Sequence, residues 1–295
     1  MTHASRLRAL LNGPAPVIAP GVYDALTALL VQQAGFACAY LSGASISFTR
    51  IGRPDLGLTT LTEVAQTVSN IRERIELPLL VDADTGFGNA LNVQRTVRLL
   101  ERMGASGIQL EDQTMPKRCG HLEGKSLVSI EEMVGKLRAA QDARVNPDTV
   151  IIARTDAVAV AGLDEALERA RAYVAAGADV LFVESPGDQH QLERIGASLG
   201  AEIPLLANMV EGGKTPLLPA DTLARMGFKL VIFPGAMMRV LSRAGAEYLS
   251  VLKQEGTTKG LLDRMFDFKR INALIGTEDL LATGKRYAPP GHDDA

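Results

Sequence analysis

Residues 79–112, LLVDADTGFGNALNVQRTVRLLERMGASGIQLED, contain a short apolar run, an amphipathic segment and a second apolar run in succession. The first run, 79–81, is continuous in hydrophobicity, as expected of a strand buried on both faces. The segment 90–103 places its apolar side chains largely on one side, which predicts a helix. Gly104 lies where a left-handed helix cap is expected, just before the run 108–110. The stretch therefore predicts a strand–helix–strand unit of a parallel sheet.

The same alternation continues along the chain. Eight short apolar runs, each bounded by turn residues, are separated by amphipathic segments; the runs are 17–19, 37–41, 79–81, 108–110, 150–153, 180–183, 205–207 and 230–233. This repeat predicts an α/β fold of the TIM type, a (β/α)8 barrel. The alternative is an open doubly wound sheet, which at 295 residues more often divides into two domains. No Pro-, Gly- or Ser-rich linker divides this chain.

The chain continues beyond what a barrel needs. We expect residues 1–295 to form a single barrel domain with a C-terminal helical extension at about 237–285. Helices are predicted at 238–254 and 258–275, where they would pack on a neighbouring subunit or cap the site. The polar tail at 287–295 is predicted to be disordered.

Composition excludes several classes of function. The net charge of −3 argues against nucleic acid as a partner, because phosphate backbones require concentrated positive charge. No apolar run approaches the roughly 20 residues that cross a bilayer, so no membrane partner is expected. The N-terminal segment lacks a secretory apolar region, and two cysteines are too few for a disulfide framework. These features predict a cytoplasmic protein.

Acidic side chains follow two neighbouring apolar runs, at the ends where barrel enzymes carry their chemistry. Asp82 and Asp84 follow one run, and Glu111 follows the next. Carboxylates without histidines favour a hard divalent cation, so we predict Mg²⁺, with Mn²⁺ as a substitute. Asp82 or Asp84 would contact the metal directly, and Glu111 and Asp55 directly or through water. The alternative for Asp84 is a turn or helix-cap role before residues 85–88.

One cysteine lies in a basic loop with the sequence KRCGH. Lys117 and Arg118 precede the thiol of Cys119, and His121 follows two residues later. A cationic surrounding stabilises a thiolate and makes its proton mobile, which predicts a reactive cysteine. The alternative is a solvated basic loop with an incidental cysteine. Cys38, by contrast, lies inside an apolar run and is predicted to be an inert core residue.

Arg154 ends another apolar run and is suited to bidentate capture of a carboxylate. Its alternative role is a structural ion pair with Glu184 or Asp156, and the two roles can coexist. A segment of small residues after the second run offers backbone N–H groups to a carboxylate; these residues are Ser42, Gly43 and Ala44.

Taken together, these motifs make the chain resemble the isocitrate lyase/phosphoenolpyruvate mutase superfamily. The resemblance runs from about residue 21 to about residue 256, and the order of the motifs is highly specific. The matching segments are 40–43, 54–57, 82–88, 111–113, 117–121, 153–157 and 208–211.

This resemblance implies a Mg²⁺-dependent enzyme that acts on small α-hydroxy- or α-keto-carboxylates through an enolate. The cysteine loop looks like that of the carbon–carbon lyase branch, which contains isocitrate, 2-methylisocitrate and 2,3-dimethylmalate lyases. Phosphonate-forming mutases and simple oxaloacetate decarboxylases of the superfamily typically lack it. Members usually form homotetramers, as dimers of dimers, in which a C-terminal helix is swapped between paired subunits. The helical extension fits this arrangement.

Individual roles follow from the implied reaction, a retro-aldol-like cleavage that leaves pyruvate. Arg154 and the metal would bind the 2-hydroxy carboxylate, Tyr40 would be the base, and Cys119 would protonate the departing enolate as general acid. Arg118 and His121 would hold that enolate by their positive charge. The other expected substrate-binding residues are Ser42, Gly43, Ala44, Gly120, Glu184 and Asn208.

Two departures from 2-methylisocitrate lyases shift the expected substrate. The chain has Val183 before Glu184 where those enzymes commonly have proline, and residues 122–125 lack their loop arginine. A dicarboxylate of the 2,3-dimethylmalate type is therefore favoured, with the tricarboxylate 2-methylisocitrate close behind. The alternative is hydrolysis or decarboxylation of oxaloacetate. A phosphoenolpyruvate phosphonomutase is less favoured because the loop lacks an identifiable phosphoryl-accepting asparagine, and a barrel kept only as a binding module would leave the acidic positions unused.

Overall fold

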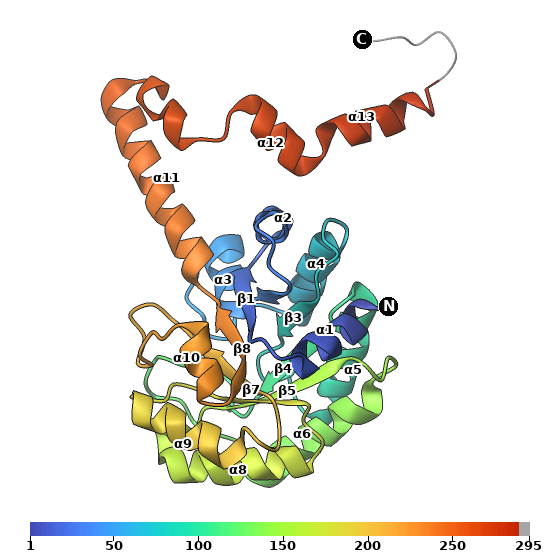
Figure 1. Cartoon of the computed structure of the whole chain (residues 1–295), viewed down its shortest axis with the longest axis vertical. Coiled ribbons are helices and arrows are strands. Elements are labelled where there is room, and N and C mark those ends of the chain that lie inside the picture. The colour runs from blue at the N-terminus through green and yellow to red at the C-terminus, as the bar shows by residue number, and fades with distance from the viewer. Residues whose placement is uncertain (289–295) are drawn as a thin grey trace. The chain divides into compact units, whose positions relative to one another are not determined.

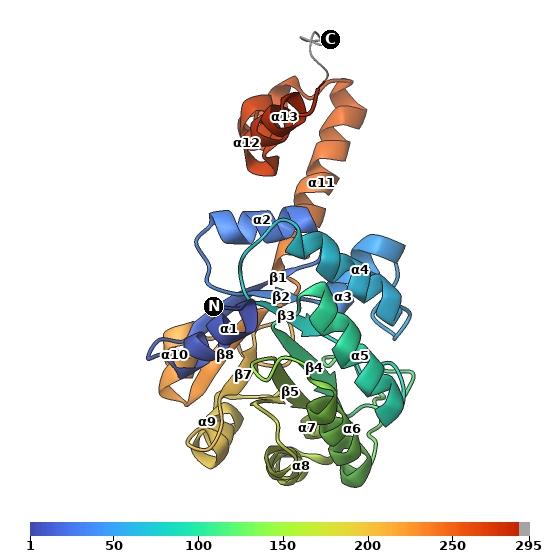
Figure 2. The same cartoon turned by 90° about the vertical axis from the view of Figure 1, so that its right-hand side faces the viewer.

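The computed structural model describes residues 1–288 and contains a closed parallel barrel. Within those residues, eight strands pair in sequence order and β8 pairs with β1, which closes the sheet. Figures 1 and 2 show the strands enclosed by a ring of helices. The predicted TIM-type fold is confirmed, and each predicted run coincides with a strand. The strands are β1 (Val17–Val22), β2 (Ala39–Leu41), β3 (Leu79–Asp82), β4 (Gly107–Glu111), β5 (Val150–Thr155), β6 (Val180–Val183), β7 (Leu205–Asn208) and β8 (Phe228–Phe233).

The strands are buried on both faces, which explains their continuous hydrophobicity. One set of strand side chains fills the barrel interior, where Leu80, Ile152 and Leu230 form a cluster with Leu7 from the first helix. The alternate set packs outward against the surrounding helices in a larger cluster. Cys38 belongs to the interior cluster and is fully buried, so its predicted core role is confirmed.

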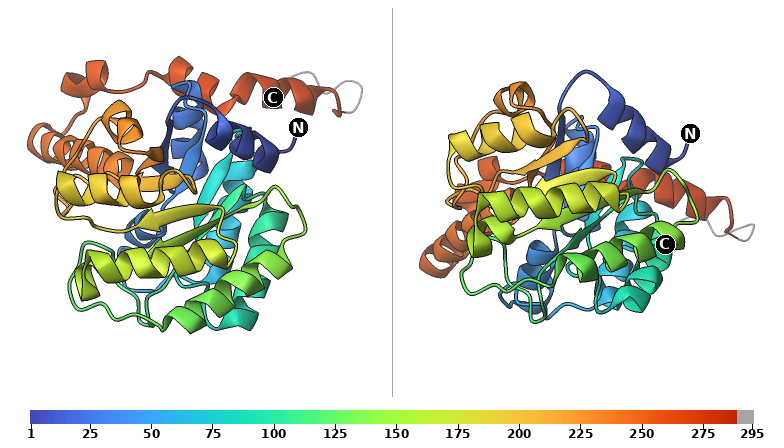
Figure 3. Two further views of the ribbon diagram at one scale, coloured as in Figure 1. Left: turned by 60° about the horizontal axis from the view of Figure 1, so that its bottom comes forward. Right: turned by 90° about the horizontal axis from the view of Figure 1, so that it is seen from below.

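Helices connect successive strands and cover the outside of the barrel, as Figure 3 shows for α5, α6 and α8. The predicted helix at 90–103 is α5; Asn89 caps its first turn, and Gly104 ends it with a φ of 99°. The helices up to β8 are α1 (His3–Asn12), α2 (Ala25–Gln33), α3 (Gly43–Ile46), the π-helical turn η1 (Ser47–Ile51), α4 (Leu61–Arg72), α5 (Ala90–Met103), α6 (Ile130–Ala143), α7 (Ala157–Ala161), α8 (Leu163–Ala175), α9 (Gln189–Leu199) and α10 (Ala220–Arg225).

The chain divides into two compact units, Met1–Arg239 and a second unit that begins at Val240. The C-terminal helices are α11 (Ala236–Glu255), the 3₁₀ helix η2 (Lys259–Arg264), α12 (Phe268–Ile275) and α13 (Thr277–Lys285). The helix predicted at 258–275 is therefore interrupted, because Asp267 caps a new helix by accepting a hydrogen bond from Arg270 N at 2.6 Å. The predicted tail begins within the described residues, but residues 289–295 lie outside them.

Strand polarity places the functional end of the barrel. All eight described strands are parallel, so their carboxyl ends open on the same side. Asp82, Glu111, Arg154 and Asn208 lie at the carboxyl ends of their strands, and Glu184 directly follows β6. In the part of the chain that the structure describes, none of the helices combines the length and hydropathy that a membrane span requires.

Candidate active site

The carboxyl ends of the strands surround a cavity of about 230 Å³. Most of the residues predicted for the site line it: Tyr40, Ser42, Ala44, Asp55, Asp82, Cys119, Gly120, His121, Arg154, Glu184 and Asn208. Asp84, Glu111 and Gly43 lie beside Asp82 at the edge of this cavity. Arg118 is exposed and is not part of the lining.

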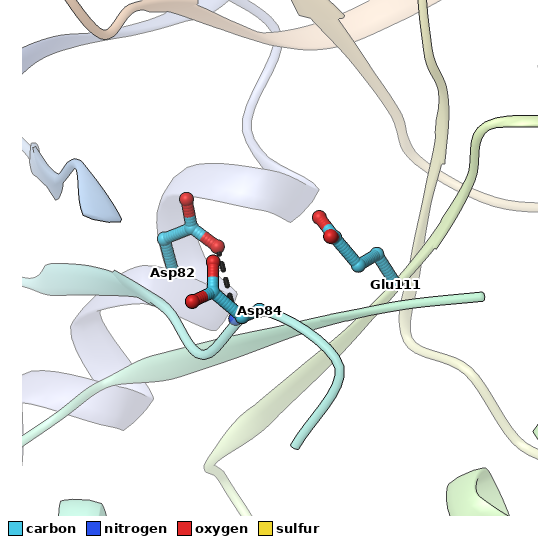
Figure 4. Close-up of side chains that lie close together, drawn as sticks. All are labelled: Asp82, Asp84 and Glu111. Carbon is cyan, nitrogen blue, oxygen red and sulfur yellow. Dashed lines mark hydrogen bonds between the residues drawn. The ribbon is translucent and has the colours of Figure 1, made fainter. Parts of the chain in front are cut away.

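Three carboxylates meet at the ends of β3 and β4. One ligand atom each from Asp82, Asp84 and Glu111 lies within 4.8 Å of the others. Figure 4 shows the two aspartates side by side, with Glu111 reaching toward them from the neighbouring strand. The backbone of Asp84 has a φ of 46°, and its N–H donates to Asp82 Oδ1 at 3.2 Å. This strained turn holds both carboxyl groups on the cavity side.

The cluster contains more negative charge than its protein partners neutralise. Burial raises the pKa of Asp84 to about 7, although the Lys117 ammonium opposes this shift. Burial also raises the pKa of Glu111 well above its ordinary value, against the effect of Arg154. Among the described residues, neither carboxylate oxygen of Glu111 has a hydrogen-bond partner. Buried carboxylates of this kind require protons or a cation, and an all-oxygen set fits a hard divalent ion such as Mg²⁺.

Asp55 is separated from this cluster by a lysine. Lys117 Nζ lies 2.5 Å from Asp55 Oδ1 and 2.6 Å from Asp84 Oδ1, and its side chain is 3% exposed. Burial would lower the pKa of Lys117, but the carboxylates of Asp84 and Glu111 outweigh it and raise the pKa well above its ordinary value. The structure thus places Asp55 on an ammonium group, whereas a direct or water-mediated metal contact was expected.

Arg154 is held by three carboxylates. Its Nε and Nη2 donate to Asp156 at 2.9 Å and 3.0 Å, Nη1 lies 3.2 Å from Glu111 Oε2, and Nη2 lies 3.3 Å from Glu184 Oε2. Burial lowers the pKa of Arg154, but these carboxylates together raise it well above its ordinary value. The guanidinium also stacks on Phe182, 5.2 Å from the ring centre. The structural ion pair anticipated from the sequence is therefore present within the cavity wall.

Cys119 is held as a thiol and not as the predicted thiolate. Its side chain is half-buried, and this burial raises its pKa above the ordinary value of 9.0. Lys117 is engaged with carboxylates, and Arg118 donates to the Glu123 carbonyl at 2.9 Å in an exposed position. Neither cation is therefore available to stabilise a sulfur anion. A protonated thiol in a cavity can donate a proton, which is what a general acid requires.

His121 is neutral in this arrangement. Its Nδ1 accepts a hydrogen bond from Lys214 N at 3.1 Å, which assigns the ring proton to Nε2. Burial lowers the pKa of His121, and the Glu184 carboxylate, 3.7 Å from Nε2, only partly offsets this. The expectation that Arg118 and His121 hold an enolate by positive charge is thus corrected, because Arg118 lies outside the cavity and His121 carries no charge.

The small residues after β2 contact polar groups of the protein itself. Gly43 N donates to Asp82 Oδ2 at 3.3 Å, and Ser42 Oγ accepts from Ser45 N at 3.2 Å to cap α3. A Cβ atom at Gly43 would lie 3.1 Å from Asp82 Oδ2, so glycine permits this close approach. The predicted carboxylate nest is therefore already used by a protein carboxylate, while Ala44 lines the cavity.

Two hydrogen-bonded chains organise the remaining polar groups. Tyr40 donates to Gln109 at 3.1 Å, and Gln109 donates in turn to Asp82 at 3.3 Å. Burial raises the pKa of Tyr40 well above its ordinary value, so the phenol is a donor in this state. On the other side, Asn208 Nδ2 donates to Glu184 Oε2 at 3.1 Å. Among the described residues, Asn208 Oδ1 has no hydrogen-bond partner.

Several contributors were not predicted from the sequence. Lys117 lies within the recognised KRCGH motif, so a rule that pairs buried lysines with strand-end carboxylates would have found it. Others carry no motif of their own and are brought to the site by folding; they are Phe48, Gln109, Lys125, Ser185, Met238 and Arg239.

Known proteins resemble the chain over nearly its full length. It is 46% identical to 2,3-dimethylmalate lyase from Eubacterium barkeri, over 98% of this chain and 99% of that protein. It is 47% identical to 2-methylisocitrate lyase from Aeropyrum pernix, over 92% of this chain and 87% of that protein. Both relatives are named lyases, in agreement with the predicted carbon–carbon lyase class.

Solved structures agree with these relatives. A crystal structure of 2,3-dimethylmalate lyase superposes with a TM-score of 0.92 at 36% identity, covering 100% of this chain and 99% of that one. Oxaloacetate acetylhydrolase bound to 3,3-difluorooxalacetate gives a TM-score of 0.91 at 36% identity and 97% coverage of both chains. Phosphonopyruvate hydrolase, in a complex with oxalate and Mg²⁺, superposes with a TM-score of 0.88 at 32% identity, and the match covers 97% of this chain and 99% of that one.

A family model described as phosphoenolpyruvate phosphomutase matches residues 7–252. That range includes every strand of the barrel and all the residues that line the cavity. The chain therefore belongs to the phosphoenolpyruvate mutase/isocitrate lyase superfamily.

Proposed function

We propose that the chain is a Mg²⁺-dependent carbon–carbon lyase that cleaves a 2-hydroxy dicarboxylate to pyruvate and a second carboxylate. The observation that carries this proposal is a carboxylate cluster that Lys117 and Arg154 only partly neutralise, whose member Asp82 lines the same cavity as the protonated Cys119. The names of the relatives support the same reaction class.

Asp82, Asp84 and Glu111 are the residues that would hold the metal, because their oxygens converge and, among the described residues, both oxygens of Glu111 lack a hydrogen-bond donor. Bound Mg²⁺ supplies Lewis-acid polarisation, which lowers the pKa of a substrate hydroxyl group. The chain orients this site through Gly43 N and Gln109, which fix the two oxygens of Asp82. Such partners of metal ligands set ligand orientation.

Substrate binding would fall to Arg154 and Asn208, which line the cavity beside the cluster. Arg154 is positively charged, and Asn208 has an amide oxygen without a partner among the described residues. The Arg154 N–H groups that face Glu111 and Glu184 are the ones a substrate carboxylate would share. Charge-assisted hydrogen bonds of this kind would position the carboxylate attached to C2 of the substrate. They would thereby orient the C2–C3 bond, which is the bond that breaks, toward the thiol.

The chemical step requires the hydroxyl proton to leave as the C2–C3 bond breaks. The bonding electron pair passes to C3, C2 becomes the carbonyl carbon of pyruvate, and the carbanion at C3 is stabilised by its carboxylate as an enolate. Cys119 then donates its thiol proton to C3, because its raised pKa keeps that proton in place at neutral pH. Tyr40 was expected to be the base, but its raised pKa keeps it a neutral phenol that donates to Gln109, so the hydroxyl proton would pass instead to a carboxylate of the cavity lining such as Glu184.

Apolar side chains in the cavity favour a substrate with alkyl substituents. Phe48, Val210, Ile232 and Met238 contribute to its lining, opposite the charged groups. Alkyl groups placed against them gain hydrophobic burial, on the order of 1 kcal/mol for each methyl group. The dicarboxylate 2,3-dimethylmalate therefore stays the first candidate, followed by the tricarboxylate 2-methylisocitrate.

A second candidate function is hydrolysis or decarboxylation of oxaloacetate. The observation that favours it is the similarity to oxaloacetate acetylhydrolase, whose structure superposes almost as well as that of 2,3-dimethylmalate lyase. This reaction needs the same carboxylate cluster and Arg154. It also leaves an enolate that must take up a proton, but the carbon that is protonated carries no alkyl substituent.

A pyruvate-release assay distinguishes these functions. The enzyme with Mg²⁺ is offered 2,3-dimethylmalate, 2-methylisocitrate, isocitrate and oxaloacetate in parallel, with glyoxylate followed for isocitrate. Release of pyruvate from a substituted malate or methylisocitrate, lost on chelation and restored by Mg²⁺ or Mn²⁺, is the expected result. Consumption of oxaloacetate with no cleavage of the hydroxy acids would replace the first function by the second.

We also propose that a second copy of the chain covers the C-terminal helices, as in a helix-swapped homotetramer. No side chain of α11, α12 or α13, all of whose residues are described, is buried. Val240, Leu249, Phe268 and Leu280 are each at least 61% exposed. Light scattering on the purified protein should give a tetramer, and Phe268→Asp should yield a smaller species. A monomeric parent protein would overturn this proposal.

A further inference from the structure

The cysteine loop is a closed structural unit. Its stem is joined by an antiparallel bridge between Gln113 and Leu127 and by a hydrogen bond from Thr114 N to Ser126 O at 2.9 Å. Cys119 lies at the far end of this stem. There the loop is tied to the barrel by the ion pairs of Lys117 with Asp55 and Asp84, by a hydrogen bond from Cys119 N to Asp55 O at 3.2 Å, and by Lys125 with Asp156. The position of the thiol therefore depends on those contacts.

Lys125 makes the most deeply buried of these contacts. Its side chain is 1% exposed, and its Nζ lies 3.0 Å from Asp156 Oδ1, whose side chain is fully buried. The same ammonium donates to the carbonyl oxygen of Gly120, the residue next to Cys119. An ammonium buried this far is unfavourable without an anion, so loss of this pair would weaken the seating of the loop around Gly120.

Asp156 connects this contact to the substrate-binding arginine. Its carboxylate accepts from Lys125 of the loop and, through both oxygens, from Arg154 of β5. One buried carboxylate is thus shared between a cation that seats the loop and a cation that faces the cavity. If Lys125 withdraws, Asp156 is left with Arg154 alone, and the charge balance around Arg154 changes.

The tip of the loop is packed directly on the same groups. A Cβ atom at Gly120 would lie 2.6 Å from Arg154 Nη2 and 2.6 Å from Glu184 Oε2. Ser185 Oγ donates to the Gly120 carbonyl at 3.1 Å, from a backbone with a φ of 57°. The Gly120 carbonyl therefore receives one donor from the loop itself and one from the barrel, and its position fixes the adjacent Cys119.

We propose that Lys125 is a positioning residue that couples seating of the Cys119 loop to the orientation of Arg154, through the carboxylate they share on Asp156. This role rests on the proposed function, because it concerns the same cavity. It differs from a role in chemistry, since the Lys125 ammonium faces Asp156 and Gly120 and is not among the groups that line the cavity.

The test uses the rate at which N-ethylmaleimide modifies the thiol in the full-length protein. Lys125→Met removes the charge and the donor but keeps an unbranched side chain, and Lys125→Gln keeps a donor without charge. We expect the modification rate to rise at least about tenfold in Lys125→Met, with a smaller rise in Lys125→Gln. A factor of ten corresponds to about 1.4 kcal/mol, which is less than the loss of one member of a buried pair usually costs.

Three controls establish that the modification rate reports on Cys119 and on the loss of the Lys125 charge in a folded protein. Cys38 is fully buried, so a Cys119→Ala variant should show no modification in the folded state. Arg171→Met, an exposed cation-to-methionine change on α8, should leave the rate unchanged. Thermal unfolding of each variant establishes that it is folded, and Lys125→Gln serves if Lys125→Met does not fold.

The outcomes separate this role from the proposed function. A folded Lys125→Met protein whose thiol reacts within twofold of the parent would overturn the positioning role. A faster reaction with an unchanged kcat/KM for the cleaved acid would overturn the coupling to Arg154. A faster thiol reaction in a protein whose parent cleaves none of the tested acids would support the loop contact while removing the proposed function.

Discussion

Glu111 and Asp112 are neighbours in the chain, are both buried, and have opposite environments. Glu111 reaches toward Asp82 and Asp84; Arg154 Nη1 lies 3.2 Å from its Oε2, but among the described residues its oxygens have no hydrogen-bond partner. Asp112 accepts hydrogen bonds from Thr155 Oγ1 at 2.7 Å, Tyr173 OH at 2.7 Å, Asp156 N at 3.0 Å and Arg169 Nη1 at 3.3 Å. Successive side chains of an extended segment point to opposite faces, which separates the two.

The difference distinguishes a carboxylate prepared for a ligand from one that holds the scaffold. Asp112 joins β5 to α8 with its oxygens occupied, so it has no capacity for a metal or a substrate. Glu111 keeps its capacity to bind a cation. Burial of its charge is unfavourable, and a bound cation would relieve this cost. Function and stability should therefore respond separately to changes on the two sides of β4, and the following variants test that separation.

The largest effect is expected for the cavity thiol. Cys119→Ser should lower kcat for cleavage about 1,000-fold, because a hydroxyl is a much weaker acid than a thiol in the same position. Calorimetry should show that Mg²⁺ binding and the melting temperature are unchanged. Cys38→Ser is the matched control and should lower stability while keeping kcat, since it places a hydroxyl in the barrel core. Equal activity of Cys119→Ser and the parent would remove the thiol from the mechanism.

A change at Asp112 should instead lower the stability of the protein. Asp112→Asn removes a buried charge from four donors and brings an amide N–H₂ among them, so the unfolding free energy should fall by about 3 kcal/mol. Chemical denaturation measures this change, and activity at low temperature should fall less than in Cys119→Ser. If Asp112→Asn is fully stable but inactive, Asp112 belongs to the active site and the comparison fails.

Glu111→Gln should show the reverse pattern on a smaller scale. The affinity for Mg²⁺ should fall at least roughly tenfold, the size of effect seen when even a partner of a metal ligand is lost. The metal-free protein should be about as stable as the parent, because the amide removes the cost of burying the Glu111 charge while Arg154 keeps its ion pairs with Asp156 and Glu184. Calorimetric titration and thermal unfolding give both quantities. Loss of stability with unchanged Mg²⁺ affinity would group Glu111 with Asp112.

The smallest expected effect is a shift in the pH at which the Cys119 thiol ionises. Burial raises the pKa of Cys119 above 9.0, so its thiolate fraction and its alkylation rate should still be increasing at pH 9. After denaturation the midpoint should move down to the ordinary value. Cys38, whose pKa burial raises to about 12, should stay unreactive in the folded protein over the same range. A Cys119 midpoint near pH 7 would instead indicate the cation-stabilised thiolate expected from the sequence.

The barrel and its functional end could be predicted from local patterns. Each strand is buried on both faces, so each appears as a continuous apolar run, and the polar residue after it marks the carboxyl end. Asp82, Glu111 and Arg154 could be assigned to one site for that reason. The break at Asp267 was missed, because a side-chain cap can begin a new helix inside an otherwise helical pattern.

Charge states could not be predicted in the same way. The basic residues near Cys119 suggested an activated thiolate, yet Lys117 pairs with Asp55 and Asp84, and Arg118 lies in an exposed position. His121 is neutral because burial outweighs its carboxylate neighbour. Each of these results depends on which groups fold around the side chain, and a linear motif does not contain that information.

The sequence by itself determined the barrel, the face on which chemistry occurs and the identity of the acidic cluster, because hydrophobic periodicity and strand polarity are local and repeat eight times. Only the tertiary structure decided which charges neutralise one another. Asp156, shared by Lys125 and Arg154, and Asp112, satisfied by α8, receive their roles from partners that are distant in the chain. Electrostatic energies depend on distance and burial in space, so they are fixed only when the chain has folded.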